Sequence, residues 1–157
     1  MMKARAIWPA ALLMAGMFLG GCGGAAAGSD SGGWASSEEV FLKRWNNMVD
    51  ADLRIDHFNH AANMNPTAYV GQGIKIDIDV GRSIFTLSSA MPERQACTFL
   101  LAAASGSTYQ EAVSMDGEAL NNSSRTGHLF AERGGVTYMV EKFGNGSWGC
   151  TSMKSRT

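Results

Sequence analysis

Two histidines and an aspartate stand close together in a spacing that suits metal binding. His57 and His60 are three residues apart, and Asp56 precedes the first of them. On a helix both imidazoles would lie on one face, and imidazole is a common ligand of transition metals. No third ligand is recognisable nearby, and His128 is isolated in the sequence. The pattern therefore favours a solvated helix face, and the sequence predicts no metal site.

Paired carboxylates are the second arrangement that could do chemistry. Asp77 and Asp79 are one residue apart in an alternating segment, so both side chains are expected on one face of a strand. Such alternation is typical of a solvated strand face, and nothing indicates that the pair flanks a substrate. The chain also has no Gly-x-Ser-x-Gly elbow and no glycine-rich phosphate loop. The sequence thus predicts no catalytic residue, no cofactor and a protein that is not an enzyme.

Residues 1–21 have the pattern of an export signal. Lys3 and Arg5 precede a mostly apolar run over residues 7–19, and residues 19–22 read Leu-Gly-Gly-Cys. A transmembrane helix is the alternative, but it needs about 20 apolar residues. This run is shorter and is interrupted by a proline and a glycine. The segment is therefore predicted to be a signal peptide.

The end of this segment resembles the lipobox of bacterial lipoproteins. The resemblance implies that diacylglycerol is transferred to the Cys22 thiol, that the chain is cleaved before Cys22, and that its new amino group is acylated. Because two or more acyl chains anchor a protein stably, a lipid-anchored envelope protein is expected. Gly23 stands where an aspartate would signal inner-membrane retention in enteric bacteria, which favours the periplasmic face of the outer membrane. The alternative is an ordinary secretory signal with an incidental cysteine.

Export would leave two further cysteines in an oxidising compartment. Cys97 and Cys150 are 53 positions apart, and an even pair outside the cytoplasm favours one disulfide. Two independent buried thiols are the competing interpretation. A metal site would need more ligands than this pair provides.

Length and charge limit the number of domains and the kind of partner. The chain has 157 residues, of which 45% are hydrophobic and 17% charged, and this suits one globular domain with a tail. Removal of Lys3 and Arg5 leaves 11 basic and 14 acidic residues, a formal net charge of −3. With no polybasic patch, a nucleic-acid partner is not expected. Residues 22–37 are rich in Gly, Ala and Ser and are expected to form a flexible tether.

A long amphipathic helix is expected to open the domain. Ser36 and Glu39 form a capping-box pattern. Apolar residues then recur at helical spacing, which predicts a helix over residues 38–62. The stripe consists of Phe41, Trp45, Met48, Ala51, Ile55, Phe58 and Ala62. It would pack on a sheet of its own domain or, alternatively, on a partner helix.

Strands and a shorter helix are expected to follow. Isoleucines alternate with charged residues over 74–80, and a return strand over 83–88 completes a hairpin. A second helix is predicted to start at Pro92, to carry Cys97 early, and to end at Gly106.

The remaining elements are expected to be extended. Residues 111–115 are predicted as a strand before an Asp-Gly turn, and residues 121–127 as a polar loop. Residues 136–141 alternate as another strand, with a partner around 129–130. The predicted fold class is α+β: one domain over residues 38–157, with a long N-terminal amphipathic helix packed on a small antiparallel sheet, a short second helix and one disulfide.

The order of elements over residues 70–151 resembles the globular head of type IVb pilins. The resemblance is carried by GQGIKI at residues 71–76, FTL at 85–87, MPERQAC at 91–97 and VSMDG at 113–117. It implies that a near-terminal cysteine, here Cys150, pairs with the helix cysteine. The match covers roughly half of the chain.

The N-terminus departs from the pilin pattern. Pilins carry a prepilin-peptidase site followed by a long apolar helix with a glutamate near its start, whereas this chain has a lipobox and a tether. The resemblance therefore implies a lipid-anchored accessory protein that contacts pilus or secretion-system proteins. The alternative function is a periplasmic ligand-binding or enzymatic lipoprotein, with a pocket at His57, His60 or Trp148.

Overall fold

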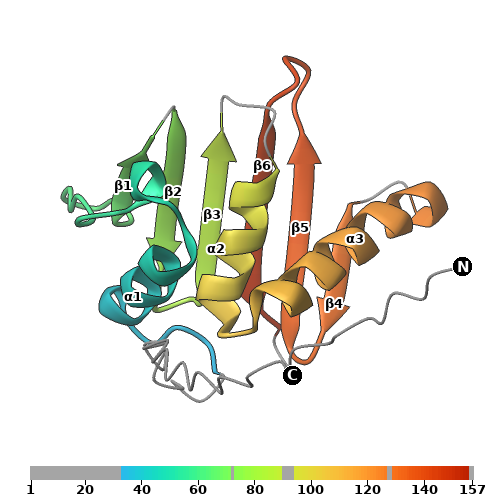
Figure 1. Cartoon of the computed structure of the whole chain (residues 1–157), viewed down its shortest axis with the longest axis horizontal. Coiled ribbons are helices and arrows are strands. Elements are labelled where there is room, and N and C mark those ends of the chain that lie inside the picture. Colours follow the sequence, from blue (N-terminus) through green and yellow to red (C-terminus); the bar gives the residue numbers. More distant parts are fainter. Residues whose placement is uncertain (1–32, 72, 90–93, 127–128, 156–157) are drawn as a thin grey trace, which may run out of the picture.

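The computed structural model describes residues 33–71, 73–89, 94–126 and 129–155. Cys22, the expected signal peptide, most of the expected tether, Pro92 and His128 lie outside the described residues. Within them, three α-helices lie on one face of a six-stranded antiparallel sheet (Figure 1). The helices are α1 (Glu38–Met48), α2 (Gln95–Ser105) and α3 (Tyr109–Thr126). The strands are β1 (Thr67–Val70), β2 (Ile74–Asp79), β3 (Ile84–Ser89), β4 (Phe130–Arg133), β5 (Val136–Lys142) and β6 (Trp148–Lys154). The structure thus confirms the α+β class.

The last strand lies in the middle of the sheet. The strand order is β1-β2-β3-β6-β5-β4, so β6 pairs with both β3 and β5. Alternation along the strands sends one set of side chains toward the helices. Across the sheet, Ile76, Leu87, Cys150 and Val140 form one such buried row. The core therefore lies between this face and the helices.

Helix α1 begins where the sequence predicts but is much shorter than expected. Ser37, rather than Ser36, caps it by accepting a 3.3 Å hydrogen bond from the Val40 N–H. The expected helix over residues 38–62 ends at Met48. Beyond it, the Asn46 amide donates to the Ile55 carbonyl at 2.7 Å and accepts from the Ile55 N–H at 2.8 Å. These side-chain bonds replace helical backbone bonds and fold the chain back over α1.

The apolar stripe survives this change of direction. The chain makes a single 3-10 turn over Ala51–Leu53, and the Trp45 indole donates to the Leu53 carbonyl at 2.7 Å. Ile55 and Phe58 are buried, as a continuous helix would also have placed them. Thus the periodicity identified four core residues correctly, of which Ile55 and Phe58 lie in an extended segment, whereas Met48 is half-buried and Ala51 and Ala62 are exposed.

Helix α3 replaces the strand, turn and loop expected between residues 111 and 127. A capping box opens it: Thr108 N–H donates to the Glu111 carboxylate at 2.7 Å, and Glu111 N–H donates to the Thr108 hydroxyl at 3.3 Å. Ala112, Met115 and Ala119 then share a buried side of the helix. The Asp-Gly pair expected to form a turn lies inside this helix.

The other predicted elements agree with the structure, whereas β1 and β6 were not predicted. β2, β3 and β5 lie at the expected positions, and β4 pairs with β5 around a Gly-Gly turn. Gly106 ends α2 in the left-handed conformation, with φ of 72°. An added Cβ there would lie 2.5 Å from the Gly33 carbonyl oxygen, so only glycine permits this close approach.

Residues 33–35 belong to the folded domain rather than to the expected tether. Ala35 is buried, and its N–H donates to the Ala104 carbonyl at 2.7 Å. Arg44 donates to the Gly33 carbonyl at 2.8 Å, and Trp34 packs edge-on against Phe85 with ring centroids 5.7 Å apart. The chain therefore joins the domain at the C-terminal end of α2.

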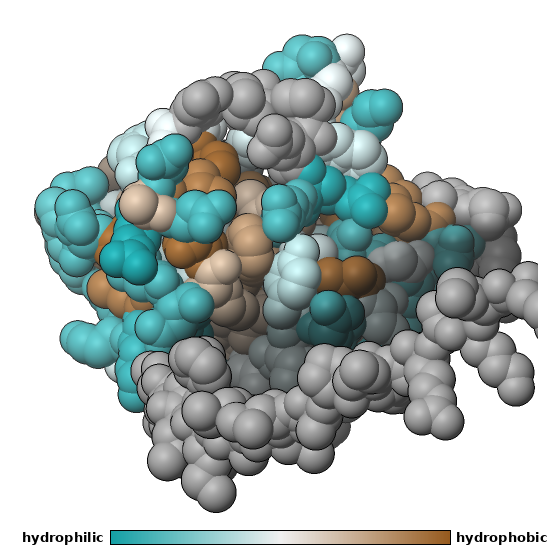
Figure 2. Space-filling model, in the orientation of Figure 1, coloured by the Kyte–Doolittle hydropathy of each residue, from teal (hydrophilic) through white to brown (hydrophobic). Residues whose placement is uncertain are grey.

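Polar residues form the rim of the helix-covered face. Apolar residues gather between the helices at its centre (Figure 2). Phe41 links α1 to the sheet by stacking on Phe85 with a centroid distance of 5.1 Å. None of the helices in the described part of the chain has the length and apolar character needed to cross a bilayer.

Candidate functional site

The face of the sheet opposite the helices carries an exposed apolar groove. Strand register places Thr86, Thr151, Met139 and Phe130 in one row across β3, β6, β5 and β4. The groove along this row has a volume of about 600 Å³. Its apolar wall consists of Phe130, Met139 and Phe143, whose exposed fractions are 36%, 44% and 38%. Three large apolar side chains on one open face form a patch that is suited to binding.

Gly149 forms part of the groove floor. It lies between Ser88 and Glu141 in the next row of the sheet. Because it has no side chain, the Phe143 ring can lie over its backbone, and an added Cβ would be 3.0 Å from two atoms of that ring. Phe143 therefore covers one end of the groove and is held by the sheet beneath it.

Carboxylates border this apolar wall. Glu141 and Glu132 project from the same open face as Met139, since they alternate with the buried residues of β5 and β4. Lys142 also borders the groove, but its ammonium group lies 5.6 Å from the centre of the Trp148 ring. The described carboxylates of Glu141 and Glu132 thus share the face of the exposed apolar side chains, whereas Lys142 alternates onto the helix-covered face.

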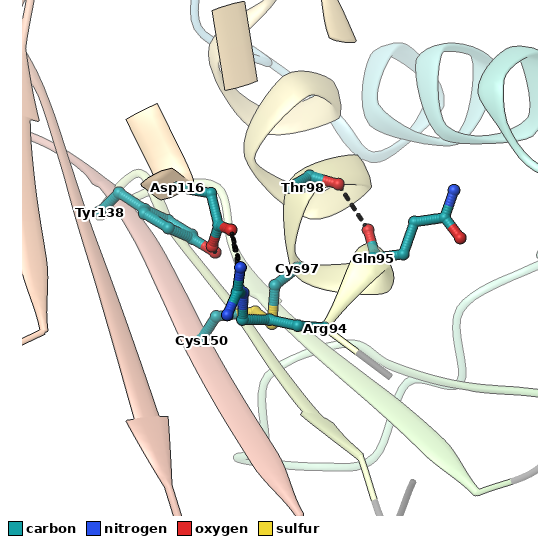
Figure 3. The surroundings of a disulfide bond; sticks show 7 residues. All are labelled: Arg94, Gln95, Cys97, Thr98, Asp116, Tyr138 and Cys150. Carbon is teal, nitrogen blue, oxygen red and sulfur yellow. Dashed lines mark hydrogen bonds and ion pairs between the residues drawn. A yellow bond between two sulfur atoms is a disulfide. The ribbon is translucent and has the colours of Figure 1, made fainter. Parts of the chain in front are cut away.

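The predicted disulfide lies directly behind the groove. Cys97 in α2 is bonded to Cys150 in β6, with Cα atoms 5.8 Å apart (Figure 3). Both cysteines are buried, and Cys150 lies between Leu87 of β3 and Val140 of β5 in the sheet. The bond fastens α2 to the central strand whose other face forms the groove.

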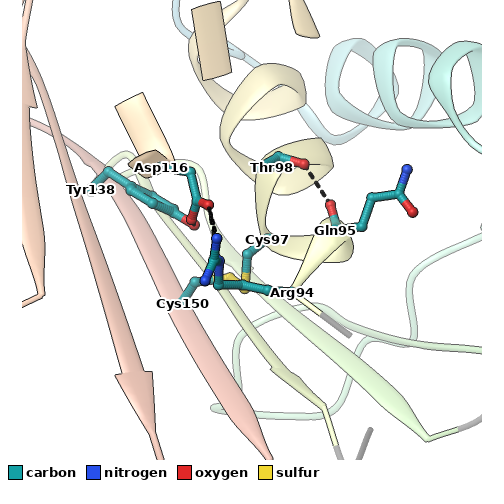
Figure 4. A network of polar contacts seen from close by, with 7 residues as sticks. All are labelled: Arg94, Gln95, Cys97, Thr98, Asp116, Tyr138 and Cys150. Carbon is teal, nitrogen blue, oxygen red and sulfur yellow. Dashed lines mark hydrogen bonds and ion pairs between the residues drawn. A yellow bond between two sulfur atoms is a disulfide. The ribbon is translucent and has the colours of Figure 1, made fainter. Parts of the chain in front are cut away.

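A buried polar cluster holds α3 beside the disulfide. Asp116, only 4% exposed, accepts hydrogen bonds from Arg94 Nε at 2.9 Å and from Tyr138 Oη at 2.8 Å (Figure 4). The Arg94 Nη2 atom is 2.8 Å from Asp116 Oδ2, the oxygen that also accepts from Arg94 Nε, whereas Tyr138 donates to Oδ1. Arg94 also lies 5.6 Å from the centre of the Trp148 ring. The cluster ties the start of α2 to α3 and β5, so it fits a structural role.

Tyr138 should make stability depend on alkaline pH. Its burial, and then the Asp116 carboxylate, raise the pKa of Tyr138 far above its usual value of about 10. The stability that the protonated Tyr138 side chain contributes is fully present below about pH 10. It is lost at higher pH, because the tyrosine of the unfolded chain ionises while that of the folded protein stays protonated. We expect the unfolding free energy to fall by about 1.4 kcal/mol per pH unit there from this group. Urea unfolding between about pH 9 and 11 measures it, and Tyr138→Phe should show a shallower decline.

The histidines singled out in the sequence do not come together with further ligands. His57 and His60 are exposed and lie after the end of α1 rather than on a helix. His60 Nε2 is 3.2 Å from a carboxylate oxygen of Glu38. Within the described residues, no group of three His, Cys, Asp or Glu side chains is placed to hold a metal ion.

The paired aspartates have structural partners. Asp77 accepts from the Thr67 hydroxyl at 2.6 Å and lies 2.9 Å from Lys75 Nζ. Asp79 accepts from the Arg82 N–H at 2.9 Å and so closes the hairpin turn. The two carboxylates therefore serve the strand and the turn of one hairpin.

Sequence reasoning missed both the groove and the polar cluster. The sequence did contain a signal for the groove. Met139, and Phe143 just after β5, occupy alternating positions that belong to the solvent-facing side of the strand, where polar residues are expected. The cluster has no comparable signal, because Arg94, Asp116 and Tyr138 are 22 positions apart at each step and meet only through the fold. Compared with known family models, curated proteins and solved structures, the chain gives no match.

Proposed function

We propose that this chain is an exported lipoprotein, anchored through Cys22, whose pilin-like domain acts by protein contacts in a pilus or secretion system of the cell envelope. The periplasmic face of the outer membrane is the favoured location. Its working surface is the groove on the open face of the sheet. No cofactor, catalytic residue or nucleic-acid partner is part of this proposal.

The observation that carries the proposal is the Cys97–Cys150 disulfide. Structural disulfides persist in oxidising compartments, so the bond supports export. It also joins the helix cysteine to the near-terminal cysteine, as the resemblance to type IVb pilins implies. The lipobox then explains how an exported domain is retained at a membrane.

The open face supports a role in protein contacts. Helices cover one face of the sheet, whereas Phe130, Met139 and Phe143 are exposed on the other. Aromatic residues and methionine are the types enriched at protein interfaces. The alternative of a small-ligand-binding or enzymatic lipoprotein is less well supported, because the groove is open and is lined neither by Asp77 and Asp79 nor by His57 and His60.

Substitution of the anchoring cysteine tests the first half of the proposal. In cells expressing the Cys22→Ser variant, we expect the protein to leave the membrane fraction and to lose incorporated palmitate, since the acceptor thiol is gone. Fractionation and labelled-palmitate incorporation measure both effects. Intact mass after alkylation, with and without reduction, should show the acyl chains and two alkylation sites that only reduction exposes.

A matched control keeps the outcome clear. Ser36→Ala, near the start of the domain and away from the thiol, should leave the protein acylated and membrane-bound. Membrane retention of Cys22→Ser, or an unlipidated mass for the unaltered chain, would contradict the anchoring. A photo-crosslinking residue at Met139 should capture an envelope protein, and the same residue at Asp56 should not.

A further inference from the structure

We propose that the groove binds a segment of a partner protein that presents apolar side chains together with lysine or arginine. This inference rests on the proposed function, from which it takes the choice of a protein partner. It adds the chemistry of the segment and the way in which it lies on the sheet.

The wall of the groove calls for apolar side chains. Phe130, Met139 and Phe143 are exposed together, and Met139 has a flexible side chain that adapts to differently shaped partners. Removing these surfaces from water on binding is favourable by about 25 cal/mol per Å² of apolar area, so they are the natural anchor points. The floor adds hydroxyl groups, since Thr86 and Thr151 face each other across β3 and β6.

The length of the groove fits a short segment. The row from Thr86 to Phe130 crosses four adjacent strands, and neighbouring strands are about 4.8 Å apart. The row is therefore about 14 Å long, which equals nearly three turns of helix at 5.4 Å per turn. A helix of about ten residues with one apolar face would cover it.

Charge selects among apolar segments. Among the described residues, Glu141 has no ion-pair partner, and it stands on the open face between Met139 and Phe143 in sequence. Lys75, which is on the same face of the described strands, is paired with Asp77 at 2.9 Å. A basic segment would neutralise the rim, whereas an acidic segment would be repelled by it.

The edges of the sheet direct the partner to the face. At the β1 edge, Asn59 exchanges backbone hydrogen bonds of 2.8 and 3.0 Å with Thr67. At the β4 edge, the Asn122 amide donates to the Phe130 carbonyl at 2.9 Å. Both edges are thus partly occupied, as in proteins that avoid pairing with additional strands. A partner is therefore expected to lie across the strands instead of extending the sheet.

Binding of two designed peptides to the full chain tests the inference. The first is a labelled helical peptide of about twelve residues, with leucine and phenylalanine on one face and lysine on the other. The second has glutamate in place of every lysine. By fluorescence anisotropy at about 0.15 M salt, the basic peptide should saturate and bind at least about tenfold more tightly than the acidic one. Met139→Gln should weaken the basic peptide about tenfold.

Matched variants separate the groove from the rest of the surface. Glu141→Lys should weaken the basic peptide about fivefold and reduce its advantage over the acidic one, because an exposed pair contributes up to about 1 kcal/mol. Asp56→Lys makes the same charge change away from the groove and should have no effect. Tyr69→Ser removes an aromatic ring that is 72% exposed on the opposite edge strand, and should also have no effect.

Three results would overturn the inference. They are equal binding of both peptides, no saturable binding of the basic one, and equal losses for Met139→Gln and Tyr69→Ser. Self-association that Met139→Gln abolishes would identify a second copy as the occupant and would overturn it too. If the peptides fail while the Met139 crosslink to an envelope protein persists, the chemistry assigned to the segment is wrong and the proposed function stands.

Discussion

Replacing both Cys97 and Cys150 with alanine should lower the free energy of unfolding by about 4 kcal/mol. In the chain-entropy model, a bond that closes a loop of about 50 residues restricts the unfolded chain by this amount. The bond joins residues 53 positions apart. Both cysteines lie in the core, so the alanines that replace them gain no contact with water that would offset the loss of stability. Urea unfolding monitored by circular dichroism measures the change, with an increased m-value if the unfolded chain expands.

Reduction provides an independent control for this prediction. The unaltered chain with a thiol reductant should approach the stability of the double variant, and the reductant should not affect the variant. A loss below about 1 kcal/mol would mean that the unfolded chain is already restrained in this region. It would also remove the bond as the main fastening of α2 to β6.

Replacing Asp116 with alanine should destabilise the domain by about 3 kcal/mol. The substitution leaves the buried Tyr138 hydroxyl without its acceptor and Arg94 without its ion pair. Losing one partner of a buried charged pair typically costs about 3–5 kcal/mol. The lower end is expected here because Arg94 is partly exposed and lies against Trp148.

A double-mutant cycle identifies the source of that loss. Tyr138→Phe alone removes the hydroxyl and should cost about 1 kcal/mol. In the Asp116→Ala background it should cost less or become stabilising, because the hydroxyl then has no acceptor. Asp116→Asn keeps an acceptor for the Tyr138 hydroxyl, so its free energy of unfolding should lie between those of the unaltered protein and Asp116→Ala. Additive losses would show that Tyr138 and Asp116 act independently, against the 2.8 Å bond between them.

Local alternation predicted β2, β3 and β5 well, because each has one apolar and one polar face, but it predicted neither β1 nor the central strand β6. In β2, isoleucine alternates with charged residues, and the structure buries every isoleucine. The return strand β3 and the late strand β5 follow from the same periodicity of two. Period-two alternation therefore identified which side chains of β2, β3 and β5 face the helices.

Helix lengths were predicted poorly because side-chain bonds decide them. The stripe beyond Met48 keeps helical spacing, yet the paired hydrogen bonds between Asn46 and Ile55 end the helix. For α3, the Asp-Gly pair indicates a turn, whereas Thr108 and Glu111 form a capping box that begins a helix. The second error was avoidable from the sequence, and the first was not.

The candidate site needed the fold before it could be seen. Phe130 and Met139 become neighbours only through the β4–β5 register, and Phe143 joins them because Gly149 leaves room for its ring. The disulfide could be predicted because two cysteines remain after Cys22 is assigned to the lipobox, and because the expected export would place them in an oxidising compartment. The groove depends on which face the helices leave uncovered.

The docking of Gly33 on Gly106 sets the route by which tension would pass through the domain. A pull from the N-terminal side reaches the C-terminal end of α2 through the bond of Ala35 to Ala104, and reaches α1 through the bond of Arg44 to Gly33. Helix α2 carries it to Cys97, and the covalent bond passes it to β6 in the centre of the sheet. The edge strands lie outside this route, whereas β6 forms part of the groove floor, so tension under the proposed anchoring would act directly beneath the binding surface.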